Sequence, residues 1–152
     1  MPNLDTVDSM EIDVSAEELF AVILDYPRMR DWYPRYKIDV IGGGPVQEGC
    51  RLSHELSPPG SPVKSRFTRT ITAIDPGRSI EETYDDGDLV GNGRWVFEPL
   101  SENRTRVSFY CKVRSNRLLM HIGFLLGGEK GHNMIYQEIL AALQTHVSQK
   151  AA

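Results

Sequence analysis

The chain has 152 residues, of which 40% are hydrophobic and 25% are charged, and its net charge is −4. This length and composition are typical of a single soluble globular domain, so we expect residues 1–152 to form one domain with an ordered core of about residues 6–148. The negative net charge argues against a nucleic-acid partner, which would require a basic surface.

The N-terminal residues MPNLDTVDSMEIDV have neither the basic start nor the apolar run of a signal peptide, which predicts a cytoplasmic protein. The longest apolar run, LLMHIGFLL at 118–126, is shorter than the roughly 18 residues of a membrane span, so stable membrane insertion is not expected. Cys50 and Cys111 lack the spacing of a zinc site and are expected to be reduced structural residues. We therefore expect no metal and no cofactor.

A strand and two short helices are predicted at the start of the chain. TVDSMEIDV (6–14) is typical of a strand. Ser15 and Glu18 form a capping box in front of the apolar run of SAEELFAVILD, which indicates a helix. Pro27 ends this helix because it disfavours helical geometry at the preceding residue. RMRDWYPRY (28–36) follows as a second short helical piece.

Residues 36–113 carry a strand pattern in six segments separated by turns rich in Gly, Pro, Asp and Asn. Links this short predict antiparallel hairpins rather than parallel crossovers. After Arg114 the pattern becomes helical, with an apolar stripe that includes Ile135, Ile139 and Leu143. A sheet cannot leave its apolar face bare, so this last helix must lie across it, and the fold class is α+β.

The segment GDLVGNGRWVF (87–97) allows two interpretations. A dinucleotide-binding turn needs a third glycine and a following helix, but Val96 and the strand-like WVFEP occupy those places. As a strand, the segment would point Gly91, Gly93, Trp95 and Phe97 to one face. The two glycines would then let the strand bend and leave space in front of the sheet, while Trp95 and Phe97 could equally be simple core residues.

The order of these motifs, from the SAEELFAVILD helix through WYPRY, GDLVGNGRWVFEP and NRTRVSFYCKV to the terminal helix, resembles the helix-grip superfamily. This superfamily, also called SRPBCC or START-like, includes the birch pollen allergen and bacterial polyketide cyclase/dehydrase-like proteins. The resemblance covers about residues 6–148. It implies a curved seven-stranded antiparallel sheet wrapped around a long C-terminal helix, with an apolar cavity for a lipid-, sterol- or polyketide-like ligand.

Our first hypothesis is therefore a binding protein for an apolar small molecule. Ligand pockets are mostly apolar with a few convergent polar groups. The expected ligand-binding residues come from the strands, from the second short helical piece (28–36) and from the last helix: Tyr33, Tyr36, Leu52, His54, Ile80, Glu82, Tyr84, Trp95, Phe97, Val107, Phe109, Phe124, His132, Asn133, Ile135 and Tyr136. The oligomeric state is left open between a monomer and a homodimer.

The alternative is a polyketide aromatase/cyclase or dehydrase. Such chemistry needs a general acid or base and a group that stabilises an oxyanion. His54, which alternates with Leu52 and Leu56, should face inward and titrate near neutral pH. Arg69 is the candidate oxyanion partner, but the alternation in VKSRFTRTITAI (63–74) leaves the inward face of that strand open.

In the cyclases of this superfamily, inner strand faces carry arginines at positions that correspond here to Thr72 and Glu82. This departure favours the binder over the enzyme. A third interpretation concerns LLMHIGFLLGG (118–128), which could form an apolar lip that touches lipid during ligand loading. The simpler interpretation of this segment is the start of the last helix.

Overall fold

The computed structural model describes residues 3–60, 62–115 and 118–151, with the side chains of the last helix from residue 130 to 150. The predicted order of elements is confirmed, including the two short helices after the first strand. The elements are β1 (Asn3–Ile12), α1 (Ala16–Leu24), a single 3-10 turn η1 (Tyr26–Arg28), α2 (Met29–Trp32), β2 (Tyr36–Val40), β3 (Arg51–Leu56), β4 (Ser65–Asp75), β5 (Ser79–Gly87), β6 (Leu89–Ser101), β7 (Arg104–Ser115) and α3 (Leu118–Ala151).

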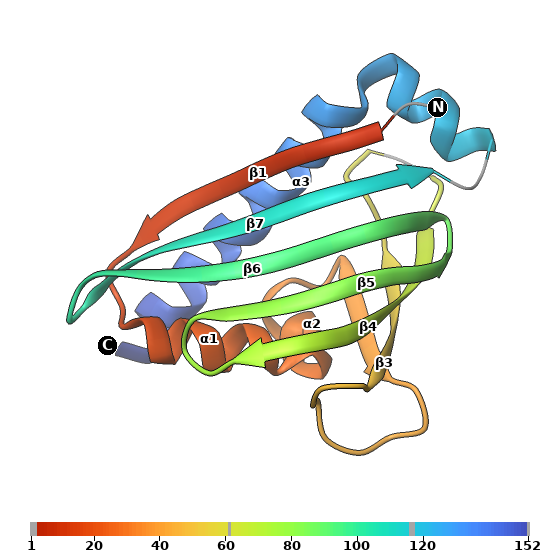
Figure 1. Cartoon of the computed structure of the whole chain (residues 1–152). Coiled ribbons are helices and arrows are strands. Elements are labelled where there is room, and N and C mark those ends of the chain that lie inside the picture. The colour runs from red at the N-terminus through yellow and green to blue at the C-terminus, as the bar shows by residue number, and fades with distance from the viewer. Residues whose placement is uncertain (1–2, 61, 116–117, 152) are drawn as a thin grey trace.

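The seven strands form one antiparallel sheet in the order β1-β7-β6-β5-β4-β3-β2. The sheet is curved, and α3 runs diagonally along its inner side with α1 and α2 at one end (Figure 1). This is the helix-grip arrangement that the motif order predicted. Within the described ranges, no helix combines the length and the apolar character needed to cross a membrane.

Local sequence explains where α1 begins and ends. The Ser15 hydroxyl accepts a hydrogen bond of 3.2 Å from the backbone N–H of Glu18, which confirms the predicted N-cap. The helix buries Leu19, Phe20 and Ile23 and ends at Leu24. The chain then turns through η1, whose Tyr26 is buried, so this turn carries a side chain into the interior beneath the sheet.

The two glycines of β6 allow close packing. At Gly91, where φ is +149°, a Cβ atom would lie 2.0 Å from the carbonyl oxygen of Lys112 on the neighbouring strand. At Gly93 a Cβ atom would lie 3.0 Å from the Phe109 ring and 3.1 Å from the Tyr84 ring. The expectation that the glycines leave unfilled space is therefore wrong at Gly93, where two aromatic rings fill the place of a side chain.

The C-terminal helix packs on the sheet face that bears Trp95, as predicted. Trp95 is 1% exposed, and its ring centroid lies 6.1 Å from that of Tyr136 on α3. The buried stripe of α3 continues through Ile139, Leu143 and Val147. This stripe and the inner side of the sheet enclose the interior, which also contains buried polar side chains.

Candidate functional site

Arg69 lies at the centre of the interior. On β4 the side chains of Phe67, Arg69 and Ile71 face inward and are buried, which settles the face that the sequence left open. Arg69 itself is only 2% exposed. A charged side chain this deep is uncommon in proteins unless it is paired, so its partners define the site.

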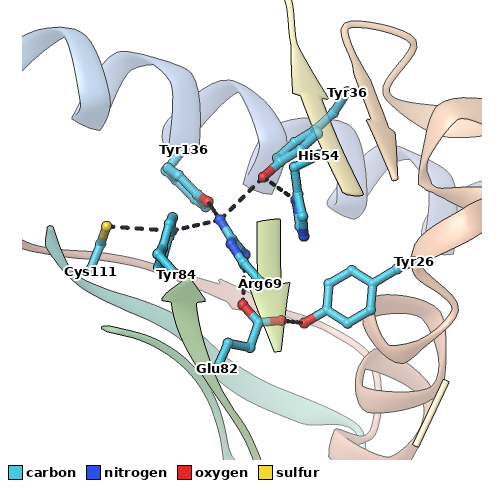
Figure 2. Close-up of polar contacts among 8 residues, drawn as sticks. All are labelled: Tyr26, Tyr36, His54, Arg69, Glu82, Tyr84, Cys111 and Tyr136. Atoms are coloured by element: carbon cyan, nitrogen blue, oxygen red, sulfur yellow. Dashed lines mark hydrogen bonds and ion pairs between the residues drawn. The ribbon is translucent and has the colours of Figure 1, made fainter. Parts of the chain in front are cut away.

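Four side chains, from the strands β2 and β5 and from α3, bind the guanidinium group (Figure 2). Its Nη1 donates to Glu82 Oε2 at 2.6 Å. Its Nη2 donates to the hydroxyl oxygens of Tyr84 at 2.6 Å, Tyr36 at 3.1 Å and Tyr136 at 3.1 Å. The guanidinium carbon also lies 4.3 Å from the centroid of the Tyr84 ring, in a cation–π contact.

Two further side chains extend this cluster towards the short helices and β3. Tyr26 of η1 donates a short hydrogen bond to Glu82 Oε1, so both carboxylate oxygens of Glu82 are paired. The Tyr36 hydroxyl lies 2.8 Å from His54 Nδ1 (Figure 2). We call these seven residues the Arg69 cluster: Tyr26, Tyr36, His54, Arg69, Glu82, Tyr84 and Tyr136.

Burial and the arginine charge set the protonation of the cluster. Burial lowers the pKa of His54 well below its usual value, and the positive charge of Arg69 lowers it further. His54 is therefore neutral at neutral pH, and the expectation that it titrates there is wrong. Burial also raises the pKa of Tyr136, to about 12, although Arg69 acts in the opposite direction. Its phenol therefore stays protonated.

The hydrogen bonds also determine which nitrogen of His54 carries the proton. The Tyr36 oxygen accepts from Arg69, so its own hydrogen is free to donate to His54 Nδ1. In a neutral imidazole the proton then resides on Nε2. His54 Nε2 is buried and has no hydrogen-bond partner among the described residues. It is a donor without an acceptor.

Other buried polar atoms are also without a hydrogen-bond partner in the described part of the chain. They include Arg69 Nε, Trp95 Nε1 and Asn133 Oδ1. Arginine and tryptophan nitrogens can only donate. Together with His54 Nε2, these are three unpaired nitrogen donors among the described residues, and each such group in a folded protein requires an explanation.

The other residues predicted for the site have several placements. Leu52, Ile80, Phe97, Val107 and Phe109 are fully buried on the inner face of the sheet. Ile135 is partly buried against this core. Tyr33 is buried, but its hydroxyl donates to Glu138 at 2.8 Å and takes no part in the cluster. The side chain of Phe124 lies outside the described residues.

His132 joins a different group of side chains, in which its Nδ1 lies 3.2 Å from Thr6 Oγ1. Sequence reasoning did not select Tyr26, which it took only as a helix end, or Cys111, which it took as a small strand residue. The inward position of Cys111 was available from its alternation with Phe109 and Val107. Nothing in the sequence indicated that Tyr26 would reach Glu82.

Four surface hollows of about 350 to 540 Å³ are defined by described residues. The 540 Å³ hollow opens mainly among outward-facing side chains of β2 to β5. None of these four lies between the sheet and α3, where aromatic rings and the Arg69 cluster are packed. Within the described residues, no three His, Cys, Asp or Glu side chains are placed to hold a metal ion.

The fold and its polar interior define a START-like protein of the helix-grip class. A family described as polyketide cyclase / dehydrase and lipid transport matches residues 4–148, and the chain belongs to this family.

Solved structures share the fold at low sequence identity. A START superfamily protein from Mycobacterium smegmatis is 16% identical, with a TM-score of 0.76 over 95% of this chain and 97% of that one. The Zhui aromatase/cyclase from Streptomyces sp. R1128 is 14% identical, with a TM-score of 0.75 over 99% of this chain and 96% of that one. Among curated proteins, the sexual inducer glycoprotein of Volvox carteri is 33% identical over 88 residues, which are 57% of this chain and 41% of that protein.

Proposed function

We propose that this protein binds a hydrophobic small molecule between the sheet and α3, and that the Arg69 cluster hydrogen bonds to an acceptor oxygen of that molecule. The observation that carries the proposal is the set of unpaired buried donors, Arg69 Nε, His54 Nε2 and Trp95 Nε1. A buried donor without a partner costs about 1–3 kcal/mol. A carbonyl or similar oxygen would satisfy such donors, and the surrounding aromatic side chains suit an apolar body.

A polyketide cyclase or dehydrase is the second candidate. Arg69 supports it, since a buried guanidinium stabilises an enolate oxygen well. The general base is the weaker part of the cyclase hypothesis. His54 Nδ1 already accepts from Tyr36 and both oxygens of Glu82 are paired, so neither offers a free acceptor for a substrate proton. The lack of a free acceptor at His54 and Glu82 favours a binding protein over an enzyme.

Two ligands of matched shape test the proposal. 2-Acetylnaphthalene carries a carbonyl group where 2-ethylnaphthalene carries a methylene group, and binding of each is measured by calorimetry and by Trp95 fluorescence. The carbonyl compound should bind more tightly by about 1.5–3 kcal/mol, the value of a hydrogen bond to a charged group. Failure of both compounds to bind would refute the proposal.

The double variant Arg69→Met/Glu82→Leu removes both charges together and keeps the interior filled, so it should fold. It should lose most of the preference for 2-acetylnaphthalene, because the charged donor Arg69 is gone and only His54 Nε2 and Trp95 Nε1 remain of the three unpaired nitrogens. Tyr33→Phe is the matched control, because Tyr33 bonds to Glu138 outside the cluster and should leave the preference unchanged. A poly-β-keto substrate incubated with the wild type should be recovered unchanged; conversion that His54→Gln abolishes in a folded protein would favour the cyclase.

A further inference from the structure

A second polar group lies where β1, β7 and α3 meet. Thr6 on β1 pairs with Cys111 on β7, and both side chains face inward. His132 of α3 packs beside them, with Nδ1 3.2 Å from Thr6 Oγ1 and 3.7 Å from Asp8 Oδ2. The imidazole ring also stacks on Tyr136 of the Arg69 cluster, with ring centroids 4.6 Å apart.

Asp8 is a buried carboxylate with one oxygen available. It is 3% exposed, and its Oδ1 accepts from Gln137 Nε2 at 3.4 Å. Its Oδ2, which faces His132, has no hydrogen-bond partner among the described residues. The separation of 3.7 Å is too long for a hydrogen bond. A small movement would make one, as often happens when a ligand tightens a site.

The Cys111 thiol connects this group to the Arg69 cluster. It is 2% exposed, and its Sγ lies 3.6 Å from the Tyr84 hydroxyl (Figure 2). On its other side, Cys111 pairs across the strands with Thr6, which contacts His132 at 3.2 Å. Burial lowers the pKa of His132, but the side chains of Asp8 and Cys111 raise it by more, so the net shift is upward. A cysteine near an imidazole, with a carboxylate 3.7 Å beyond that imidazole, is a set of groups from which a reactive thiol can be built.

We propose that Cys111 is a nucleophile in the wall of the ligand site and forms a covalent bond with an α,β-unsaturated ketone held there. His132 accepts the thiol proton, and the sulfur bonds to the β-carbon while the carbon–carbon double-bond pair moves towards the carbonyl oxygen. The proton then passes from His132 to the α-carbon. No leaving group, oxidant or reductant is required. Asp8 acts as a positioning residue for His132.

The position of Arg69 favours this class of ligand. In the addition, negative charge develops on the carbonyl oxygen at the far end of the conjugated system from the sulfur. Tyr84 adjoins the sulfur, and Arg69 reaches the Tyr84 hydroxyl at 2.6 Å, so the guanidinium lies one side chain away from the thiol. A donor at that place stabilises the developing charge. This inference rests on the proposed function, because the ketone must enter the same interior.

The test uses 4-phenylbut-3-en-2-one and its saturated analogue 4-phenylbutan-2-one. Binding of the saturated ketone is measured by calorimetry, and the adduct of the unsaturated one by intact-mass spectrometry and peptide mapping. The adduct should form on Cys111, while the half-buried Cys50 is the internal control. The rate should fall by roughly 10²-fold or more in His132→Gln, which removes the base.

The dependence of the rate on pH separates positioning from structure. The groups that face His132 and Cys111 are Asp8, Tyr84 and Tyr136, with Arg69 behind the two tyrosines. His132 must be neutral to accept a proton, so the rate should fall as the pH drops through its pKa. Asp8→Asn should move this midpoint to lower pH. Thr6→Val removes an uncharged contact and should leave the midpoint in place.

Each outcome decides the inference. If the saturated ketone binds but no adduct forms on Cys111, the inference is wrong and the proposed function stands. If neither ketone binds and no adduct forms, the inference is wrong, and binding of the two naphthalenes then decides the proposed function. The inference is overturned if the adduct forms mainly on Cys50. It is also overturned if Cys111 reacts as fast in His132→Gln as in the wild type. Should His132→Gln fail to fold, equal midpoints in Asp8→Asn and Thr6→Val would overturn it.

Discussion

Two regions of the interior are built in different ways. Near α1 the contacts are apolar: Phe20 meets Phe97 edge-to-face at 5.7 Å, and the last turns of α3 bury Leu143 and Val147. Around β3, β4 and β5 the same sheet encloses an arginine, a glutamate, a histidine and several phenols (Figure 2). One sheet and one helix thus hold an apolar region and a polar region together.

The difference indicates which region is needed for stability. Apolar burial contributes about 25 cal/mol per Å² of surface removed from water. A buried ion pair contributes little by comparison, and replacing both charges by apolar side chains of similar size is often neutral or stabilising. The apolar region therefore holds the fold together, while the Arg69 cluster requires another explanation, for which we propose ligand recognition.

The largest effect should come from breaking the ion pair on one side. Glu82→Leu leaves Arg69 charged and buried without a carboxylate, which should lower the free energy of unfolding by about 3–5 kcal/mol. The double variant Arg69→Met/Glu82→Leu should recover most of this loss. Urea denaturation of the two variants measures both values. A double variant no more stable than Glu82→Leu would show that the cluster itself supports the fold.

A truncation in the apolar region should lower the stability of the protein without changing its preference between ligands. Leu143 is fully buried, so Leu143→Ala removes packing and leaves a cavity, at a cost of about 2–5 kcal/mol. The preference for 2-acetylnaphthalene over 2-ethylnaphthalene should be unchanged, because no polar contact is altered. Denaturation and calorimetry on the same sample check the two expectations. A lost preference would mean that the two regions are coupled.

A smaller loss is expected from Tyr36→Phe. The hydroxyl accepts from Arg69 and contacts His54, and hydrogen bonds to charged groups contribute about 1.5–3 kcal/mol. Tyr33→Phe is the matched control because its bond to Glu138 lies at a partly exposed position. Tyr33→Phe should lower the free energy of unfolding by less than Tyr36→Phe in the same denaturation experiment. Equal losses would contradict a stronger hydrogen bond at the Arg69 cluster.

The apolar region was predictable from the sequence and the polar cluster only in part. Alternation along β3 and β6 placed His54 and Trp95 inward because strand side chains point to opposite faces in turn. The alternation along β4 could not decide the orientation of Arg69, because threonines occupy one face of the strand and an arginine interrupts the other.

The partners of Arg69 depend on strand register, which the sequence does not reveal. β4 pairs with β5 through two register shifts, one of them between Thr68 and Arg69. These irregularities bring Arg69 opposite Tyr84 and within reach of Glu82. Tyr26 arrives from a turn about forty residues earlier in the chain than β4, and only the packed structure brings it to Glu82.

The last comparison is between His54 and His132, which should respond to pH in opposite ways. Burial lowers the pKa of His54 in the folded state, so below about pH 6.5 the unfolded chain takes up a proton that the folded chain does not. Its contribution to stability is therefore present above that pH and is lost as the pH falls.

His132 behaves in the reverse sense: burial lowers its folded pKa, but the side chains of Asp8 and Cys111 raise it by more. Its contribution is fully present below about pH 6.5 and is lost as the pH rises through the folded pKa. Each proton changes the free energy of unfolding by at most ~1.4 kcal/mol per pH unit. His54→Gln should flatten the acid side of the stability curve, and His132→Gln should flatten it above pH 6.5. Denaturation curves from pH 5 to 9 measure both, and a His54→Gln variant as acid-sensitive as the wild type would contradict the burial of a neutral imidazole in the cluster.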